Sequence, residues 1–569
     1  MRRKTPLVLL LLGLWGIAPA CTIGVADGRA TASGRPLLWK TRDASGVHNG
    51  LRYVPDEGWR YVTIADPGNP SAWMGVNEHG FAILNSYSSD LRETRYGNGE
   101  LMQLALAECA NIDDFVALLD STNITGRSTL ANFGVIDAGG GAAIFETGAT
   151  SYVRYDTADT ASGYIVRANF SFTGGGSIGT ARYERATNIV ETLIAGDSLR
   201  HDTLARQMLR DLSDSESAPF ELPYQHQWAP GRPFGYIDSD WSICSNTTVS
   251  AAVIEGVLPS ESAWLSTLWV MPGNPLTSVM LPAWPTGAVP SAAAIDSGQQ
   301  ISQLTFFAIN LKQRLFDFPF IVTWLDTWKL VDASGGGWLA ELALFEAGLL
   351  DQADSLLCAW RIVPPDDAAM LAAADSLGAQ ALAFLSQAEL PSTAVADFSA
   401  SPVQGIAPLE VQFTDRSRHQ PWSWSWDFDG DGVPDSDDMN PAHTYTQPGI
   451  YSVALAVNNG EDLIEKTALV KVGQEQNEQS YMRQSYPNPF HRQAVIEYSI
   501  PRGGHVRLRV YDVRGRRVDT LVNGWQDAGA HVAAWNPELS LGRRLPAGVY
   551  IYRLEGPGQD IARRLVLMP

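Results

Sequence analysis

The sequence predicts an α+β chain of several domains, and three features of its pattern support this. Between residues 21 and about 285, short β-forming runs alternate with helical patterns such as 101–119 and 181–193. From about 298 to 390, apolar residues recur at the three- and four-residue spacing that is typical of helices. From about 393 the pattern is β again, in two parcels of roughly eighty to ninety residues with the strand lengths of small sandwiches.

We therefore expect four regions after an N-terminal leader. An α+β domain covers 21–285, and a helical extension follows at 286–390. Two all-β domains cover 393–472 and 480–569. The polar segment between them, 473–479, contains no large apolar residue and is typical of a linker.

Size and charge narrow the class of protein. The chain has 569 residues, of which 45% are hydrophobic, and this length is enough for about three or four domains with real cores. Its net charge is −21 and it has no basic stripe, so we exclude nucleic acid as a partner. The acidity favours solubility outside the cell. After the leader, no uninterrupted apolar run reaches about 18 residues, so we expect no transmembrane helix.

The first twenty residues have the three parts of an export signal. Residues 2–4 are basic, residues 7–17 form an apolar run too short to be a stable membrane anchor, and Ala18-Pro19-Ala20 offers small residues before a cut. We expect removal of the signal peptide 1–20 and a secreted or cell-surface location.

Cleavage after Ala20 would make Cys21 the first residue of the mature chain. A free α-amine titrates at about 7.7–8.0, close enough to neutrality to take the proton of the thiol. Nucleophile and base would then belong to one residue. Two alternatives stay open: a lipoprotein anchor, which Ala18 and Pro19 fit poorly, and a disulfide partner. The cysteines are scattered without a CxxC pair, which argues against a disulfide framework and a zinc site (Cys21, Cys109, Cys244, Cys358).

A nucleophile at the first residue needs a strand to hold it and a second strand beside it. Gly34 supplies a turn and residues 36–39 a returning strand, which ends in Lys40 and Asp43. The Lys40 cation would favour thiolate over thiol, and Asp43 would bond the α-ammonium or orient the thiol. The alternative is a solvated, charged strand end.

The opening CTIGVADGRATASGRPLLWKTRD resembles that of the N-terminal nucleophile (Ntn) cysteine hydrolases. This superfamily includes choloylglycine hydrolase, penicillin V acylase, acid ceramidase and the isopenicillin N acyltransferase–carcinine hydrolase group. Its members begin Cys-Thr and carry Arg-x-x-Asp where this chain has Lys40-x-x-Asp43. Lysine keeps the positive charge but lacks the bidentate fork of arginine.

The resemblance implies a four-layer αββα fold for 21–285, with no cofactor for catalysis. It also implies a secreted amidase or acylase that cleaves a linear C–N amide bond of a small molecule, with acyl transfer as a further activity. A dipeptidase of the related Cys-Thr branch is one alternative. A non-catalytic surface binding protein on a degenerate Ntn scaffold is another.

Two asparagines resemble the family's oxyanion-binding residues. The turn GVNEHGF at 75–81 leads into a strand with Asn85. Asn85 lies two residues closer to Gly80 than the corresponding asparagine of bile-salt hydrolases does, and Tyr87 stands at the family's own spacing. The strand YIVRANF ends at Asn169. An amide N–H aimed at the developing negative oxygen contributes about 2.7–4 kcal/mol to such a reaction. Without the resemblance, either asparagine is equally a turn or strand-end cap.

A helix start at 177–185 resembles one in the acyltransferase group, which implies that Arg182 reaches the site or binds a substrate carboxylate. The alternative is a charge on a helix surface. Cys244 is most simply a buried core thiol.

Residues 393–472 resemble a PKD (polycystic kidney disease) domain, an immunoglobulin-like sandwich, on the motif WDFDGDG at 426–432. Acids follow at the first, third, fifth, ninth and twelfth places of one loop, with glycine at the sixth. This spacing is typical of a structural Ca²⁺ site, and the alternative is a merely acidic turn. The predicted ligands are Asp427, Asp429, Asp431, Asp435 and Asp438.

Residues 480–569 resemble the C-terminal sorting domain of the type IX secretion route, or its FlgD-like immunoglobulin relatives. The phrases that carry this resemblance are YPNPF at 486–490, YDVRGR at 511–516 and LPAGVY at 545–550. It implies the secretion machinery as a partner. It also argues against a lipid anchor at Cys21, because that route exports the chain across the outer membrane.

Overall fold

The computed structural model describes most of the chain after the leader. The described residues are 21–69, 71–88, 90–91, 97–213, 219–226, 234–287, 289–295, 301–316, 323–419, 421–458, 462–473 and 480–569. The predicted signal peptide 1–20 and residues 474–479 of the predicted linker lie outside them.

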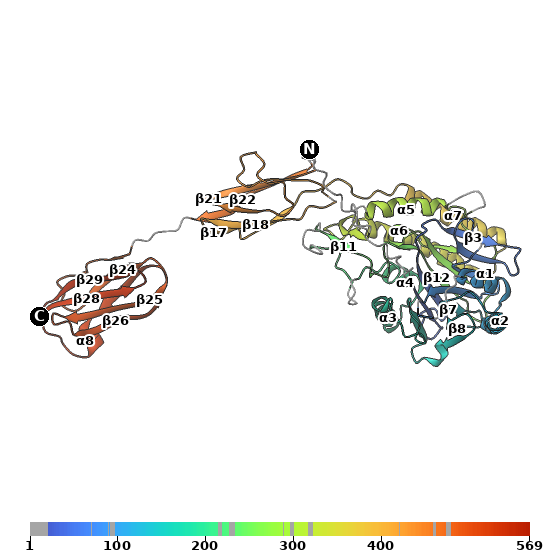
Figure 1. The fold of residues 1–569 in the computed structure, drawn as a ribbon, viewed down its shortest axis with the longest axis horizontal. Helices are drawn as coiled ribbons and strands as arrows, with labels where there is room; N and C mark the ends of the chain where they lie inside the picture. Colours follow the sequence, from blue (N-terminus) through green and yellow to red (C-terminus); the bar gives the residue numbers. More distant parts are fainter. Residues whose placement is uncertain are drawn as a thin grey trace, which may run out of the picture. The chain divides into compact units, whose positions relative to one another are not determined.

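Two antiparallel sheets form the centre of the part that precedes Leu390 (Figure 1). One has six strands in the order β10-β1-β2-β12-β13-β14, and the other has seven in the order β3 to β9. The first contains β1 (Thr22–Ala26), β2 (Leu37–Asp43), β10 (Tyr164–Arg167), β12 (Thr248–Glu255), β13 (Thr267–Pro272) and β14 (Leu281–Ala283). The second contains β3 (Gly50–Val54), β4 (Tyr61–Ala65), β5 (Met74–Asn77), β6 (Ala82–Tyr87), β7 (Ala131–Ile136), β8 (Ala142–Thr147) and β9 (Tyr152–Asp156).

The central strands read as nearly continuous apolar runs because they are covered on both faces. In β6, Leu84 belongs to a core shared with Val25 and Leu38 of the other sheet. Its neighbour Ile83 belongs to a second core, with Phe115. Alternate residues of a strand point to opposite faces, so the seven-stranded sheet packs on the six-stranded sheet with one face and on helices with the other.

Seven helices lie in the described residues of this part. Their bounds are α1 (Asn98–Glu108), α2 (Ile112–Thr125), α3 (Thr180–Ala195), α4 (His201–Gln207), α5 (Gln303–Leu315), α6 (Trp338–Ile362) and α7 (Asp367–Ser386). Short 3₁₀ turns lie at Thr157–Asp159, Ala263–Leu265, Pro275–Thr277 and Thr327–Lys329, and a small pair is formed by β11 (Tyr236–Asp238) and β15 (Trp324–Asp326).

The helical pattern at 101–119 is two helices rather than one. The Asn111 side chain accepts a hydrogen bond from the amide of Asp114 at 3.0 Å, which caps a new helix start. Helices α1 and α2 supply Leu106 and Phe115 to the second core. Helix α3 packs on β1 and β10, and α4 packs on β12.

The helical segment predicted at 286–390 packs into the same core as the sheets. Leu311 of α5 and Leu342 of α6 lie in one cluster with the strand residues, and α5 contacts β13 while α7 contacts β14. Helix α7 is long and apolar enough to cross a membrane. It is nevertheless a core helix, because Met370 and Ala374 are buried in the same cluster.

The part predicted as a PKD domain holds two sheets, with strand orders β16-β18-β20 and β17-β22-β21-β19. Trp426 is buried beside Phe398 and Phe428. The strands are β16 (Phe398–Ser401), β17 (Gln404–Ile406), β18 (Leu409–Asp415), β19 (Trp424–Asp427), β20 (Ala442–Tyr445), β21 (Gly449–Val457) and β22 (Asp462–Gly473).

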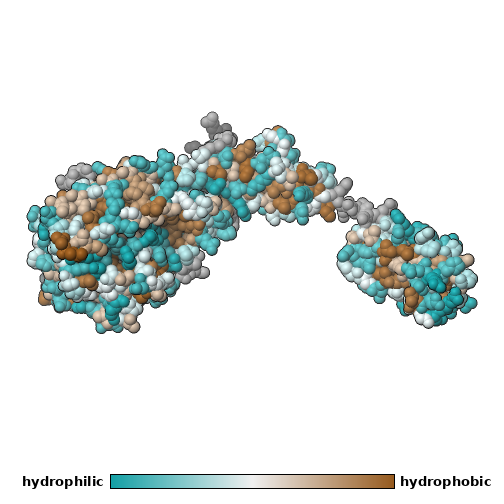
Figure 2. Space-filling model, turned by 180° about the vertical axis from the view of Figure 1, so that it is seen from behind, coloured by the Kyte–Doolittle hydropathy of each residue, from teal (hydrophilic) through white to brown (hydrophobic). Residues whose placement is uncertain are grey.

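The C-terminal part also holds two sheets, ordered β23-β24-β27 and β26-β25-β28-β29. Its core includes Trp535 and Tyr552. Exposed apolar side chains such as Trp525 and Val532 remain at its surface, and Figure 2 shows hydrophobic areas between hydrophilic ones on one face. The elements are β23 (Tyr481–Met482), β24 (Ala494–Ile500), β25 (Gly504–Asp512), β26 (Arg517–Gln526), β27 (Gly529–Trp535), α8 (Pro537–Leu541), β28 (Gly548–Gly556) and β29 (Gln559–Leu567).

The mixed α and β content predicted from the sequence is confirmed: two sheets with helices precede Leu390, and β-sheets fill the parts that follow.

Candidate active site

Strand pairing gathers the predicted catalytic residues at one end of the six-stranded sheet. Cys21 directly precedes β1 and is buried. On one side of β1, Ile23 lies opposite Lys40 of β2, and on the other side it lies opposite Arg167 of β10. The end of β2 and the residues after β10, which include Asn169, therefore flank Cys21.

Lys40 is not at a solvated strand end. Its side chain is buried, and Nζ donates hydrogen bonds to Asn85 Oδ1 at 2.8 Å and to the carbonyl of Trp73 at 3.0 Å. Burial lowers the pKa of Lys40 to about 8, and the negative charge of a Cys21 thiolate opposes that shift. The lysine is thus a buried cation whose charge acts on the sulfur of Cys21.

Asp43 is buried at the end of the same strand. The hydroxyl of Thr248, in the neighbouring strand β12, donates to Asp43 Oδ1 at 2.6 Å. Among the described residues, Oδ2 has no hydrogen-bond partner. Burial raises the pKa of Asp43 to about 6, while Arg182, the Thr248 hydrogen bond, Lys312 and Lys40 act in the opposite direction. The carboxyl therefore keeps one buried oxygen for a further donor.

Arg182, near the start of α3, points into the site and is not a surface charge. It is 5% exposed. Nη2 donates to Asn169 Oδ1 at 2.9 Å and Nη1 donates to Thr22 Oγ1 at 3.4 Å. Burial lowers the pKa of Arg182, and the charges of Asp43 and Cys21 oppose the shift. Its guanidinium fixes which way the amide of Asn169 faces.

Both predicted oxyanion asparagines are buried with the site. Asn85 accepts from Lys40 through its carbonyl oxygen, which leaves its N–H₂ directed away from that lysine. Asn169 Nδ2 donates to the main-chain carbonyl of Tyr87 at 2.9 Å. Of the two positions that the sequence left open in β6, Asn85 therefore contacts Lys40, whereas Tyr87 contributes a carbonyl that accepts from Asn169.

The loop that carries Asn169 is fixed by two carboxylates that the sequence did not single out. Asp90 accepts from the amides of Ser171 and Gly176, at 3.0 and 2.9 Å. Glu146 Oε1 accepts from the amide of Phe172 at 2.9 Å, and Glu146 also pairs with Arg167. These hydrogen bonds from main-chain amides to fixed acceptors restrict the conformation of the loop.

Sequence reasoning also missed Thr248 and Lys312. Thr248 became visible as a site residue only through its contact with Asp43. Lys312, on α5, is partly buried and donates to the carbonyl of Thr248 at 3.2 Å. In the sequence, the signal for Lys312 was a lysine within an apolar helical pattern. That pattern does not predict which residues the lysine contacts.

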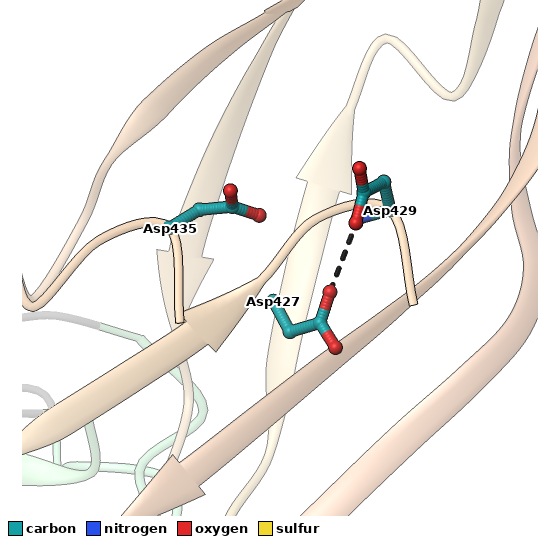
Figure 3. Close-up of side chains that lie close together, drawn as sticks. All are labelled: Asp427, Asp429 and Asp435. Carbon is teal, nitrogen blue, oxygen red and sulfur yellow. Dashed lines mark hydrogen bonds between the residues drawn. The ribbon is translucent and has the colours of Figure 1, made fainter. Parts of the chain in front are cut away.

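In the acidic loop, three of the five predicted ligands come together. Asp427, Asp429 and Asp435 each place one oxygen within 4.8 Å of the others. Figure 3 shows their side chains around a common space, with the amide of Asp429 donating to Asp427 Oδ1 at 3.3 Å. Asp431 instead accepts from the amide of Val433 at 2.7 Å, and Asp438 is not in the group.

The three grouped carboxylates are an all-oxygen set, which suits Ca²⁺ better than a metal that prefers nitrogen or sulfur. Main-chain amides of the same loop already donate hydrogen bonds to some of these carboxylate oxygens. Asp427 accepts from the amides of Gly430 and Gly432 at 2.7 and 2.8 Å, and Asp435 Oδ2 accepts from Phe428 at 2.7 Å. Asp427, Asp429 and Asp435 would hold the ion.

Two protein-family models match the chain. Residues 30–223 match the family described as acyl-coenzyme A:6-aminopenicillanic acid acyl-transferase. This match supports the resemblance to the Ntn acyltransferases and, in general terms, an enzyme that hydrolyses amides or transfers acyl groups. Residues 391–472 match the PKD domain, which supports the PKD domain predicted there.

Three solved structures are among those similar to the chain. An N-acylethanolamine-hydrolyzing acid amidase ortholog from Caenorhabditis elegans is 12% identical and has a TM-score of 0.25, over 30% of this chain and 79% of that one. A mutant conjugated bile acid hydrolase from Clostridium perfringens is 10% identical with a TM-score of 0.27, over 44% and 89%. A penicillin V acylase from Agrobacterium tumefaciens is 14% identical with a TM-score of 0.28, over 47% and 86%. No curated protein matches the chain.

Proposed function

We propose that this protein is an exported amidase or acylase whose nucleophile is the thiol of Cys21, exposed with its α-amine when the leader is removed. One observation carries the proposal. A buried cysteine at the start of a central strand shares its surroundings with a buried lysine, a buried aspartate and a buried arginine. Buried charges are costly and gather where chemistry needs them.

The reaction begins with transfer of the thiol proton to the α-amine of Cys21. The thiolate attacks the carbonyl carbon of a linear amide, and a tetrahedral oxyanion forms. Amide N–H groups of Asn85 and Asn169 donate to that oxygen. The C–N bond breaks as the α-ammonium returns its proton to the leaving amine, and a thioester remains on sulfur.

Water or a second amine then attacks the thioester and gives up a proton to the α-amine. The acid or the new amide leaves, and the thiol is restored. Lys40 stabilises the thiolate by its charge, and Arg182 holds Asn169 in place through its carbonyl oxygen.

Asp43 serves the α-amine in this scheme. In the register of β1 with β2, Thr22 lies opposite Thr41. Continued toward the start of the chain, that register puts Arg42 opposite Cys21 and Asp43 one residue further, on the side of the Cys21 nitrogen. The Asp43 oxygen that lacks a partner among the described residues would then accept from the α-ammonium.

The test compares mature protein with Cys21→Ala and Cys21→Ser on N-acyl amino acids, β-lactams and dipeptides. We expect Cys21→Ala to lose at least about a thousandfold in kcat/KM while keeping its melting temperature. Preference for dipeptides would identify the dipeptidase alternative. An active Cys21→Ala protein, or a wild-type chain whose N-terminus by mass is uncut or acylated, would contradict the proposal.

We also propose that the leader and the C-terminal part direct export, with the secretion machinery as partner of residues 480–569. Support comes from the type IX sorting phrases in its sequence and from a separate hydrophobic core in that part. Deleting 480–569 should leave the protein inside the cell envelope, which fractionation followed by immunoblotting would show.

We propose, finally, that the acidic loop binds a structural Ca²⁺ through Asp427, Asp429 and Asp435. Their oxygens already surround one space.

A further inference from the structure

Helix α5 brings a partly buried lysine, Lys312, to the charged end of the six-stranded sheet. This helix lies outside the matched residues 30–223, yet it is anchored beside the site. Thr305 at its start donates to the carbonyl of Asn49 at 2.9 Å, and the carbonyl of Ala308 accepts from Thr277 at 2.9 Å. These bonds fix how far along the sheet the helix lies.

Lys312 lies one turn beyond Ala308, and its amine reaches the first residue of β12. Nζ donates to the carbonyl of Thr248 at 3.2 Å. The hydroxyl of the same threonine donates to Asp43 Oδ1 at 2.6 Å. Thr248 therefore links the cation of Lys312, which is partly buried, to the carboxyl group of Asp43, which is buried.

Charge supports the geometry. Burial lowers the pKa of Lys312 to about 8, and the negative charge of Asp43 acts against that shift. The groups whose charges act on Asp43 come from three elements: Lys40 from β2, Arg182 from α3 and Lys312 from α5. Cys244, which precedes β12, faces Asp43, Lys312 and Arg210, and its burial raises its pKa to about 12, so it stays a neutral thiol.

We propose that Lys312 is a positioning residue of the active site, which keeps Asp43 ionised and its Oδ2 turned to the N-terminal amine of Cys21. Lysine acts here on the carboxylate by charge and, through Thr248, by a hydrogen-bonded link. The helical segment after residue 286 is then part of the catalytic unit and not an appendage. The inference rests on the proposed function of Cys21.

The experiment measures the rate at which iodoacetamide alkylates Cys21 between pH 5 and 9, by mass spectrometry of the N-terminal peptide of the mature chain. Cys358 is exposed and serves as the internal reference thiol. Wild type is compared with Lys312→Met and Lys312→Arg. Lys329→Met is the control, because Lys329 is a buried lysine that donates to the carbonyl of Arg314.

Loss of the Lys312 cation should favour protonated Asp43, so the acidic limb of the Cys21 profile should move to higher pH by roughly half a unit or more. Lys312→Arg, which keeps the positive charge, should hold the limb close to its wild-type position, and Lys329→Met should leave the limb in place. An unshifted limb in Lys312→Met would overturn the inference. An equal loss of rate at every pH in both Lys312 variants would also overturn it, because that result indicates a structural role.

If Lys312→Met does not fold, Lys312→Gln gives the same test. It removes the cation and keeps a polar side chain that can still donate to the carbonyl of Thr248. The acidic limb should again move upward, and an unchanged limb would overturn the inference. Failure of the proposed function has a different signature, since Cys21 would then react no faster than Cys358 in the wild type.

Discussion

The end of β2 and the acidic loop at 427–438 both gather charged residues that a sequence motif marks, but they hold them differently. Lys40 and Asp43 are almost fully buried, and within the described part of the chain each has one or two hydrogen-bond partners for its side chain. In the loop, Asp429 and Asp435 are exposed, and main-chain amides of the loop donate to Asp427.

The difference separates reactive charge from structural charge. A buried ion interacts strongly with its neighbours because little water screens it, so its proton affinity moves. An exposed carboxylate held by main-chain amides is screened, and its remaining oxygens suit a hydrated cation. The same residue type thus serves chemistry in one place and loop shape in the other.

The largest expected effect concerns the oxyanion donors. Asn169→Ala should lower kcat by about a hundred- to a thousandfold, because a donor to the developing charge is lost. Steady-state kinetics on the best substrate of the amide panel would measure it. Asn188→Ala on the outer part of α3 is the control and should be nearly silent. Equal losses in both variants would show that the buried site has no special electrostatic role.

A second effect concerns pH. Asp43 acts as a carboxylate, so activity should rise as pH increases through about 6. Lys40 acts as a cation, so activity should fall as pH increases through about 8. A bell-shaped kcat/KM profile between these limits is expected. Lys40→Arg, which keeps its charge to higher pH, should extend the basic side. A basic limb that does not move would contradict the assignment to Lys40.

The smallest effect concerns the acidic loop. Adding Ca²⁺ should raise the melting temperature of the part containing 393–472 by a few degrees, about the shift that 1 kcal/mol gives a small domain. Calorimetry with and without a chelator would measure it. Asp427→Asn should abolish the shift and leave amidase activity unchanged. An effect of Ca²⁺ on amidase activity would contradict the assignment of a purely structural role to the acidic loop.

Local motifs predicted much of the site. The strand that starts after Cys21, its return through 37–43, and the strand that ends before Asn169 all follow from short-range alternation and turn residues. The motif at 75–85 also placed Asn85, which contacts Lys40.

What the sequence missed depends on packing between distant segments. Lys312 meets Thr248 from 64 positions away. No local period encodes such a meeting. The split between α1 and α2 was a local signal, the Asn111 cap, hidden within one apolar pattern. In the acidic loop, spacing named five aspartates, but glycine turns and main-chain amides bring only three together.

The position of Cys21 at the very start of β1 makes the precursor a zymogen in the proposed scheme. While a residue is still attached before Cys21, its nitrogen is an amide, which has no basic lone pair to receive a proton. The thiol then lies among the same buried side chains, but the base that would take its proton is missing. Cleavage one residue too early would therefore yield a correctly folded but inactive protein. In this scheme, activation depends on how accurately the leader peptidase cuts.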